Sequence, residues 1–113
     1  MRDDELALAA TRRLPPGALA GLHEAFAGEV AQRLPALTAA VGSGDPAALA
    51  AAVRDAHSLG SSAAVVGEPE ASRAARRVEA LLSDLQTADR GPWLAVLRDE
   101  VETLRRALVR WSS

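Results

Sequence analysis

The sequence predicts an all-α protein, and three observations support this class. Alanine, leucine, arginine and glutamate, which are strong helix formers, are abundant, whereas aromatic residues make up 3% of the chain and isoleucine is absent. Apolar residues recur at steps of three and four over long stretches, as they do on one face of a helix. Short segments that contain glycine and proline separate these stretches. We therefore expect an antiparallel up-down four-helix bundle with a short N-terminal helix, as a single domain over residues 1–113.

The first half of the chain contains two of the predicted helices. A short helix over residues 4–13 precedes Pro15-Pro16-Gly17, which would end it because proline disfavours helical backbone in the residue before it. A long helix over residues 17–41 carries one apolar stripe. Pro35 lies inside this helix and predicts a bend or a break. Gly42-Ser43-Gly44 is a predicted loop.

Three further helices are predicted in the second half. Asp45-Pro46 marks the start of the first, since an acidic N-cap followed by proline is a common start signal. This helix runs to about Val66, and Gly67 with Pro69 closes it. The other two helices are predicted over residues 69–86 and 92–111, with a turn over 87–92 between them. The last helix has the alternating three–four spacing of a bundle seam.

Composition and charge exclude several classes of function. The 13 basic residues against 15 acidic ones give a net charge of −2, so there is no basic field for nucleic acid. The chain has no cysteine, and His23 and His57 lie too far apart in sequence to suggest a metal site. No stretch approaches the roughly 18–20 apolar residues of a membrane span, and the acidic N-terminus predicts no signal peptide. We expect a soluble cytoplasmic protein that binds no metal and, lacking a glycine-rich phosphate loop, has no ATP site of its own.

One segment, from Arg54 to Gly67, carries residues suited to chemistry. On a helix, His57 falls on the flank of the apolar stripe. Its neighbours on the same face are mostly small: Ala50, Arg54, Gly60, Ser61 and Ala64. A neutral imidazole on a low surface suits a phosphoryl-carrying histidine, because the active site of a second protein must reach the ring nitrogen. Hydroxyl and cationic groups beside it would bind the phosphoryl oxygens.

The run His57-Ser58-Leu59-x-x-Ser62-Ala63-x-x-Val66-Gly67 resembles the signature of the histidine-containing phosphotransfer (HPt) family. That signature is H-x-(L/I)-K-G-(S/A)-(S/A), with a glycine ten residues after the histidine. The resemblance extends from about Phe26 to Leu85. It implies a carrier that relays a phosphoryl group through His57 between aspartates of response-regulator receiver domains, fed by a hybrid sensor kinase. It also implies that the receiver holds the magnesium and that this chain needs no cofactor.

The resemblance further assigns a role to Glu79, which lies 22 positions after the histidine. In the family, a polar residue at that position hydrogen-bonds the δ nitrogen of the imidazole from the adjacent helix. The helical pattern places Glu79 beside the Val78/Leu82 seam, which is compatible with this role. The alternative is that Glu79 pairs with an arginine on a solvated helix face.

Two positions depart from the HPt signature. The family's lysine is replaced by Gly60, and the glycine that follows it is replaced by Ser61. Arg54, Gly60 and Ser61 are the candidate phosphate contacts, and Gly60 also suggests close packing or docking. Arg76 and Arg77 on the next helix are other substitutes for the lysine.

Several alternatives remain open at the level of sequence. A degenerate HPt-like adaptor would bind receiver domains without carrying phosphate, whereas a sensor-kinase dimerisation domain would be an obligate dimer. The polar outer faces favour a monomer. Arg73, Arg76 and Arg77 form either a solvated face or a surface for an acidic receiver pocket. His23, Trp93 and Trp111 are interpreted as boundary, core or cap residues without a functional role.

Overall fold

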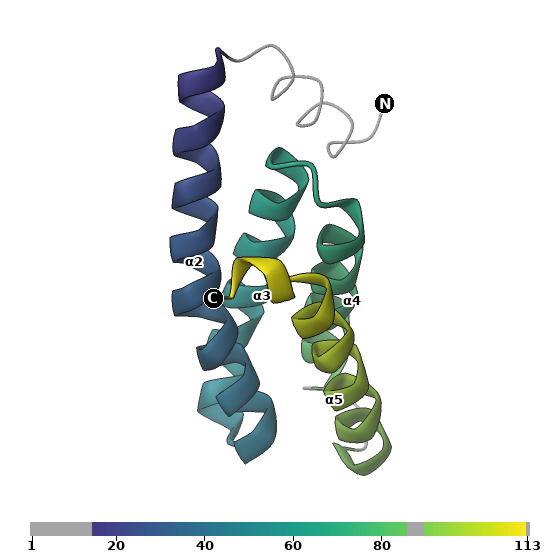
Figure 1. Ribbon diagram of the computed structural model, residues 1–113. Coiled ribbons are helices and arrows are strands. Elements are labelled where there is room, and N and C mark those ends of the chain that lie inside the picture. The colour runs from purple at the N-terminus through teal and green to yellow at the C-terminus, as the bar shows by residue number, and fades with distance from the viewer. Residues whose placement is uncertain (1–14, 86–89, 113) are drawn as a thin grey trace.

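The computed structural model describes residues 15–85 and 90–112, so the helix predicted over residues 4–13 lies outside the described range. The described chain forms four α-helices and a short 3-10 helix: α2 (Pro16–Ser43), α3 (Pro46–Val65), α4 (Pro69–Leu85), α5 (Arg90–Ala107) and η1 (Val109–Trp111). Consecutive helices run antiparallel around a common core (Figure 1). The predicted all-α four-helix bundle is confirmed.

Helix α2 is one continuous element, slightly longer than the 17–41 predicted. Gly44 ends it in a left-handed conformation, φ 69°, and donates its backbone N–H to the Ala40 carbonyl. The helix continues through Pro35, so the predicted break is absent. Pro35 is exposed, and so is Ala31, whose carbonyl lacks the helical N–H that proline cannot donate.

Helix α3, which carries His57, is capped at both ends. The Asp45 side chain accepts a hydrogen bond from the Ala48 N–H at 3.0 Å, as an N-cap does. At the other end Gly67 adopts φ 79°, and its N–H donates to the Ala64 carbonyl. The Glu68 N–H reaches back to the Ala63 carbonyl at 2.8 Å, which completes a Schellman motif. Both ends agree with the prediction to within a residue.

The last helix differs from its predicted range of 92–111. Helix α5 begins two residues earlier and ends at Ala107, after which the chain tightens into η1. The Trp111 N–H bonds the Leu108 carbonyl, three residues back, at 2.9 Å. The Trp111 ring packs edge-on against Phe26 of α2, with 4.9 Å between ring centroids. The chain therefore ends in a tighter turn than the apolar spacing predicted, and Trp111 in this turn packs against α2.

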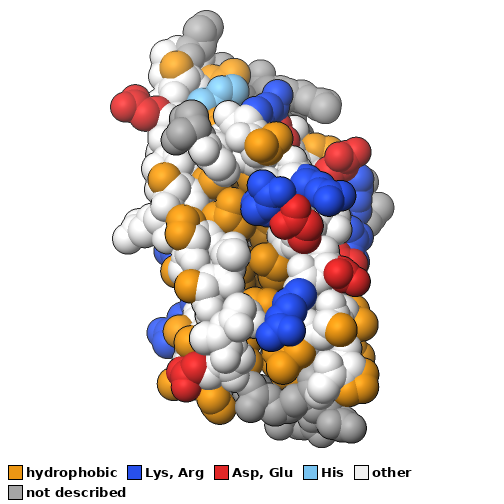
Figure 2. All heavy atoms as spheres, turned by 60° about the horizontal axis from the view of Figure 1, so that its bottom comes forward, with side chains coloured by type: hydrophobic (Ala, Val, Ile, Leu, Met, Phe, Trp, Pro, Cys, Tyr) orange, Lys and Arg blue, Asp and Glu red, His pale blue; other side chains and the backbone are white. Residues whose placement is uncertain are grey.

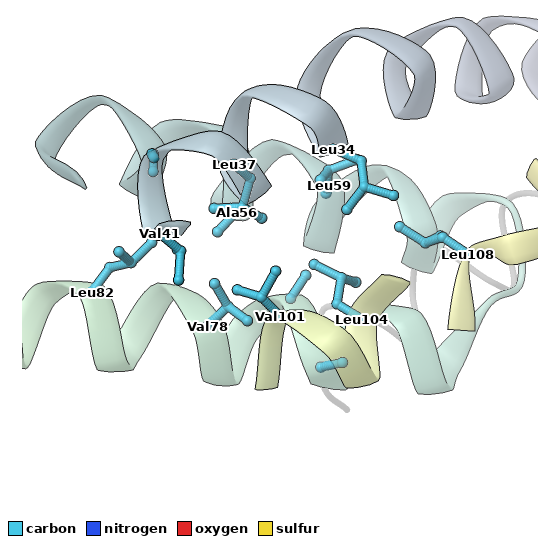
Figure 3. Close-up of a cluster of buried hydrophobic side chains, with 14 of the residues drawn as sticks. Leu34, Leu37, Val41, Ala56, Leu59, Val78, Leu82, Val101, Leu104 and Leu108 are labelled. Atoms are coloured by element: carbon cyan, nitrogen blue, oxygen red, sulfur yellow. The ribbon is translucent and has the colours of Figure 1, made fainter. Parts of the chain in front are cut away.

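The core receives buried side chains from all four helices (Figure 3). Leucine and valine fill its centre, and the labelled set comprises Leu34, Leu37, Val41, Ala56, Leu59, Val78, Leu82, Val101, Leu104 and Leu108. The most extensive interface lies between α3 and α4. The two helices are rich in small buried residues: Ala56, Gly60, Ala63, Ala64, Ala71, Ser72 and Ala75. Across the interface, Gly60 lies against Ser72 and Ala75. Small side chains let the two helices approach closely, and this interface positions the residues around His57.

Candidate functional site

His57 lies on the outer surface of α3, near α4. Its side chain is 67% exposed, in contrast to the fully buried Ala56 and Leu59 beside it in sequence. Helical geometry explains this difference, because adjacent residues are rotated by about 100° around the helix axis. A ring this exposed is accessible to the active site of another protein.

One nitrogen of the ring is held by a carboxylate from α4. The Nδ1 atom of His57 lies 3.2 Å from Glu79 Oε1 and 3.1 Å from Glu79 Oε2. Because an ionised carboxylate only accepts hydrogen bonds, this contact favours the tautomer that carries the proton on Nδ1. The Nε2 lone pair is then left on the other side of the ring. Of the two alternatives for Glu79, the geometry supports the histidine partner.

Gly60, one turn after His57, is buried against α4. Its carbonyl accepts a hydrogen bond of 2.9 Å from the buried Ser72 hydroxyl. A Cβ atom added at Gly60 would lie 3.4 Å from Ala75 Cβ and 3.4 Å from Arg76 Cγ. The structure therefore places Gly60 at a close helix contact, in contrast to the phosphate contact suggested from the sequence.

The other two phosphate-contact candidates are exposed. Arg54 lies one turn before His57 and Ser61 one turn after it, both on the outer surface of α3. By helical rotation these two residues fall on the flank of His57 opposite to Gly60. The structure therefore places Arg54 and Ser61 on the same surface as the ring, on the side away from α4.

The three arginines of α4 have different surroundings. Arg77 faces α5, where its Nε donates to Glu100 at 3.1 Å. Arg73 and Arg77 line a polar groove between α4 and α5, together with Arg106. Arg76 instead lies on the α3 side, with its Cγ close to Gly60. Arg76 therefore packs beside the helix that carries His57.

Charges elsewhere on the surface are largely paired. On α5, the pKa of Glu102 is lowered to about 2, chiefly by the side-chain hydrogen bond from Arg105. Desolvation opposes this shift, while the charges of Arg105 and Arg106 add to it. Figure 2 shows arginine and acidic side chains side by side on one face of the molecule, next to exposed hydrophobic side chains. No group of three or more potential metal-ligating His, Cys, Asp or Glu side chains occurs within residues 15–85 and 90–112. No helix in the same ranges is long and apolar enough to cross a membrane.

Ser72 is the residue near this site that the sequence did not indicate. It is fully buried, and its hydroxyl fastens α4 to the backbone of α3 at Gly60, one turn from His57. The available signal was a polar residue within the inward-facing pattern of a helix, next to Ala71 and one turn before Ala75.

The structure is a four-helix bundle with an exposed histidine, and a carboxylate of the adjacent helix contacts one nitrogen of that ring. This arrangement defines a class of helical proteins whose imidazole is accessible to a partner protein. The model of the Hpt domain family matches residues 21–107, more than half of the chain, and the chain belongs to this family. Membership indicates a role related to phosphotransfer in two-component signalling, where such domains interact with receiver domains and kinases. It also separates this chain from the alternative of a sensor-kinase dimerisation domain. Searches of the curated proteins and of the solved structures found no match.

Proposed function

We propose that this protein is a phosphorelay carrier that accepts and donates a phosphoryl group at His57. The observation that carries the proposal is the exposed imidazole whose Nδ1 lies 3.1 Å from the Glu79 carboxylate. A phosphoacceptor histidine needs an accessible ring nitrogen and a fixed tautomer, and the exposure of the ring together with its contact to Glu79 supports both. Gly60 and Ser72 contribute by packing α3 against α4, so that the two side chains stay opposite each other.

The transfer step is balanced with the groups of this chain and an aspartyl phosphate of the partner. The Nε2 lone pair of His57 attacks phosphorus, the P–N bond forms, and the P–O bond to the aspartate breaks, which releases the carboxylate. The proton stays on Nδ1, so the ring becomes positively charged and the Glu79 carboxylate stabilises that charge. Transfer to a second receiver is the reverse of this step.

The partners in this proposal are response-regulator receiver domains and a hybrid sensor kinase. The receiver contributes the aspartate and the magnesium ion, while this chain contributes the imidazole and needs no cofactor. We propose that the carrier acts as a monomer in the cytoplasm, where one exposed imidazole per molecule is sufficient. The activity is stoichiometric, since the phosphoryl group rests on the protein between two transfers.

The test is phosphoryl transfer from a radiolabelled receiver domain to the wild-type protein, to His57→Gln and to Glu79→Gln. We expect acid-labile, alkali-stable label on the wild type and none on His57→Gln, with unchanged circular dichroism. Glu79→Gln should be labelled about 10- to 100-fold more slowly, because a neutral amide stabilises the charged ring less well. Label retained on His57→Gln would refute the assignment.

The alternative function is an adaptor that binds receivers without accepting phosphate. It is favoured by one observation, namely that the family's lysine position is occupied by the buried Gly60. The same experiment separates the two functions. An adaptor would bind phosphorylated receivers with normal affinity, yet neither the wild type nor any variant would become labelled.

A further inference from the structure

We propose that Arg76 binds the phosphoryl group carried by His57, and that Gly60 is the residue that gives it access. This inference rests on the proposed carrier function and concerns the same site. Helices α3 and α4 run antiparallel (Figure 1). Glu79 of α4 lies opposite His57, and Arg76, one turn before Glu79, lies opposite Gly60, one turn after His57. The Arg76 side chain therefore crosses toward α3 one helical turn from the ring.

The contact between these two residues depends on the missing side chain at position 60. A Cβ there would lie 3.4 Å from Arg76 Cγ, and any longer side chain would extend into the space that the arginine stem occupies. Arg76 is exposed, and the stem of its side chain packs over the glycine. One helical turn is about 5 Å, which is within reach of an arginine fork that starts beside Gly60.

A cation beside the ring would offset the negative charge that the phosphoryl group brings. The phosphoryl group brings close to two negative charges next to an imidazole that is already paired with the Glu79 carboxylate. Arginine suits this place, because its planar guanidinium can donate two parallel hydrogen bonds to phosphoryl oxygens.

The other arginines near the site are less well placed. Arg77 points toward α5, where its Nε lies 3.1 Å from Glu100, so its side chain does not extend toward α3. Arg54 lies on the opposite flank of His57, away from α4 and from Glu79. Arg76 is the one that approaches the ring from the helix that also supplies its carboxylate partner.

The experiment uses phosphoramidate as a small phosphoryl donor, so that the readout does not depend on docking of a receiver. The labelling rate and the half-life of the phosphohistidine are measured for the wild type, Arg76→Ala, Arg76→Lys and Arg54→Ala. Arg73→Ala is the matched control, since it removes an exposed arginine of α4 that lines the groove toward α5. Circular dichroism and thermal unfolding of each variant report on the fold.

We expect Arg76→Ala to lower the labelling rate about three- to tenfold, the effect of losing one solvent-exposed charge-assisted contact. Arg76→Lys should keep part of the rate because it keeps the charge. Arg73→Ala should match the wild type. In the Arg76→Ala background, Gly60→Lys should restore part of the labelling rate, because it places a cation from α3 in the space that the Arg76 side chain has left.

Two results would overturn the inference and leave the carrier function standing. One is an Arg76→Ala variant that is labelled as fast as Arg73→Ala, while His57→Gln remains unlabelled. The other is a loss of rate in Arg54→Ala without a loss in Arg76→Ala. If the wild type accepts no label from phosphoramidate or from any receiver, the proposed function fails, and this inference fails with it.

Discussion

At position 60 the chain places a glycine in the interior of α3, where glycine is intrinsically less favourable than alanine by up to about 1 kcal/mol. Its neighbours across the interface are Ala75 and Arg76 of α4. The buried Ser72 hydroxyl, also of α4, donates a hydrogen bond to the Gly60 carbonyl. At the scale of single residues, the close contact between α3 and α4 thus has no room for a side chain much larger than a methyl group at position 60.

The cost of filling this contact can be tested directly. For Gly60→Ala we expect the free energy of unfolding to rise by up to about 1 kcal/mol, because a Cβ at 3.4 Å makes an ordinary contact and alanine favours the helix. For Gly60→Leu we expect a decrease of about 1–3 kcal/mol through overpacking. Urea denaturation measures both. A destabilised Gly60→Ala would mean that the helices cannot move apart even slightly.

At the scale of elements, the ends of α3 are determined by local chemistry. Asp45 accepts a backbone N–H at the start, and Gly67 provides the left-handed residue of the Schellman motif at the end. Each of these interactions lies within four residues of the helix end that it stabilises. This short range is the reason why the predicted and observed boundaries of α3 agree so closely.

Two glycine substitutions distinguish a capping glycine from a helical one. Gly67→Ala should lower the free energy of unfolding by about 1–2 kcal/mol, because a Cβ is strained at φ 79°. Gly28→Ala is the matched control in α2, where a Cβ would meet nothing within 4 Å, and it should raise stability by about 0.5–1 kcal/mol. Thermal unfolding gives both values, and shifts of equal sign would contradict the assignment of Gly67 as a cap.

At the scale of the whole molecule, the four helices share one core (Figure 3). Leu37 of α2 and Leu104 of α5 are both fully buried in it, although they lie far apart in sequence. Helices that share a core should lose their structure together. The site depends on this cooperation, since His57 and Glu79 come from different helices.

A single cavity in the core should therefore affect every helix. Leu37→Ala should lower the free energy of unfolding by about 2–5 kcal/mol. Unfolding followed by far-ultraviolet circular dichroism and by tryptophan fluorescence should shift to the same new midpoint. Separate midpoints for the two signals would show that α2 and the C-terminal half unfold independently.

The sequence by itself determined the helical class, the ends of α3 and the position of His57 on the flank of its helix. These features follow from signals within a few residues, namely apolar spacing, an N-cap aspartate and a left-handed glycine. Glu79 was also identified from the sequence, through its spacing in the resemblance to the HPt family.

Only the tertiary structure decided the distance between Glu79 and His57 Nδ1, the burial of Gly60 beneath Arg76, and the tightened turn that seats Trp111 on Phe26. Each of these contacts joins residues of different helices. Their geometry depends on how side-chain volumes mesh across an interface, and the periodicity of one helix carries no information about the volumes of its neighbour.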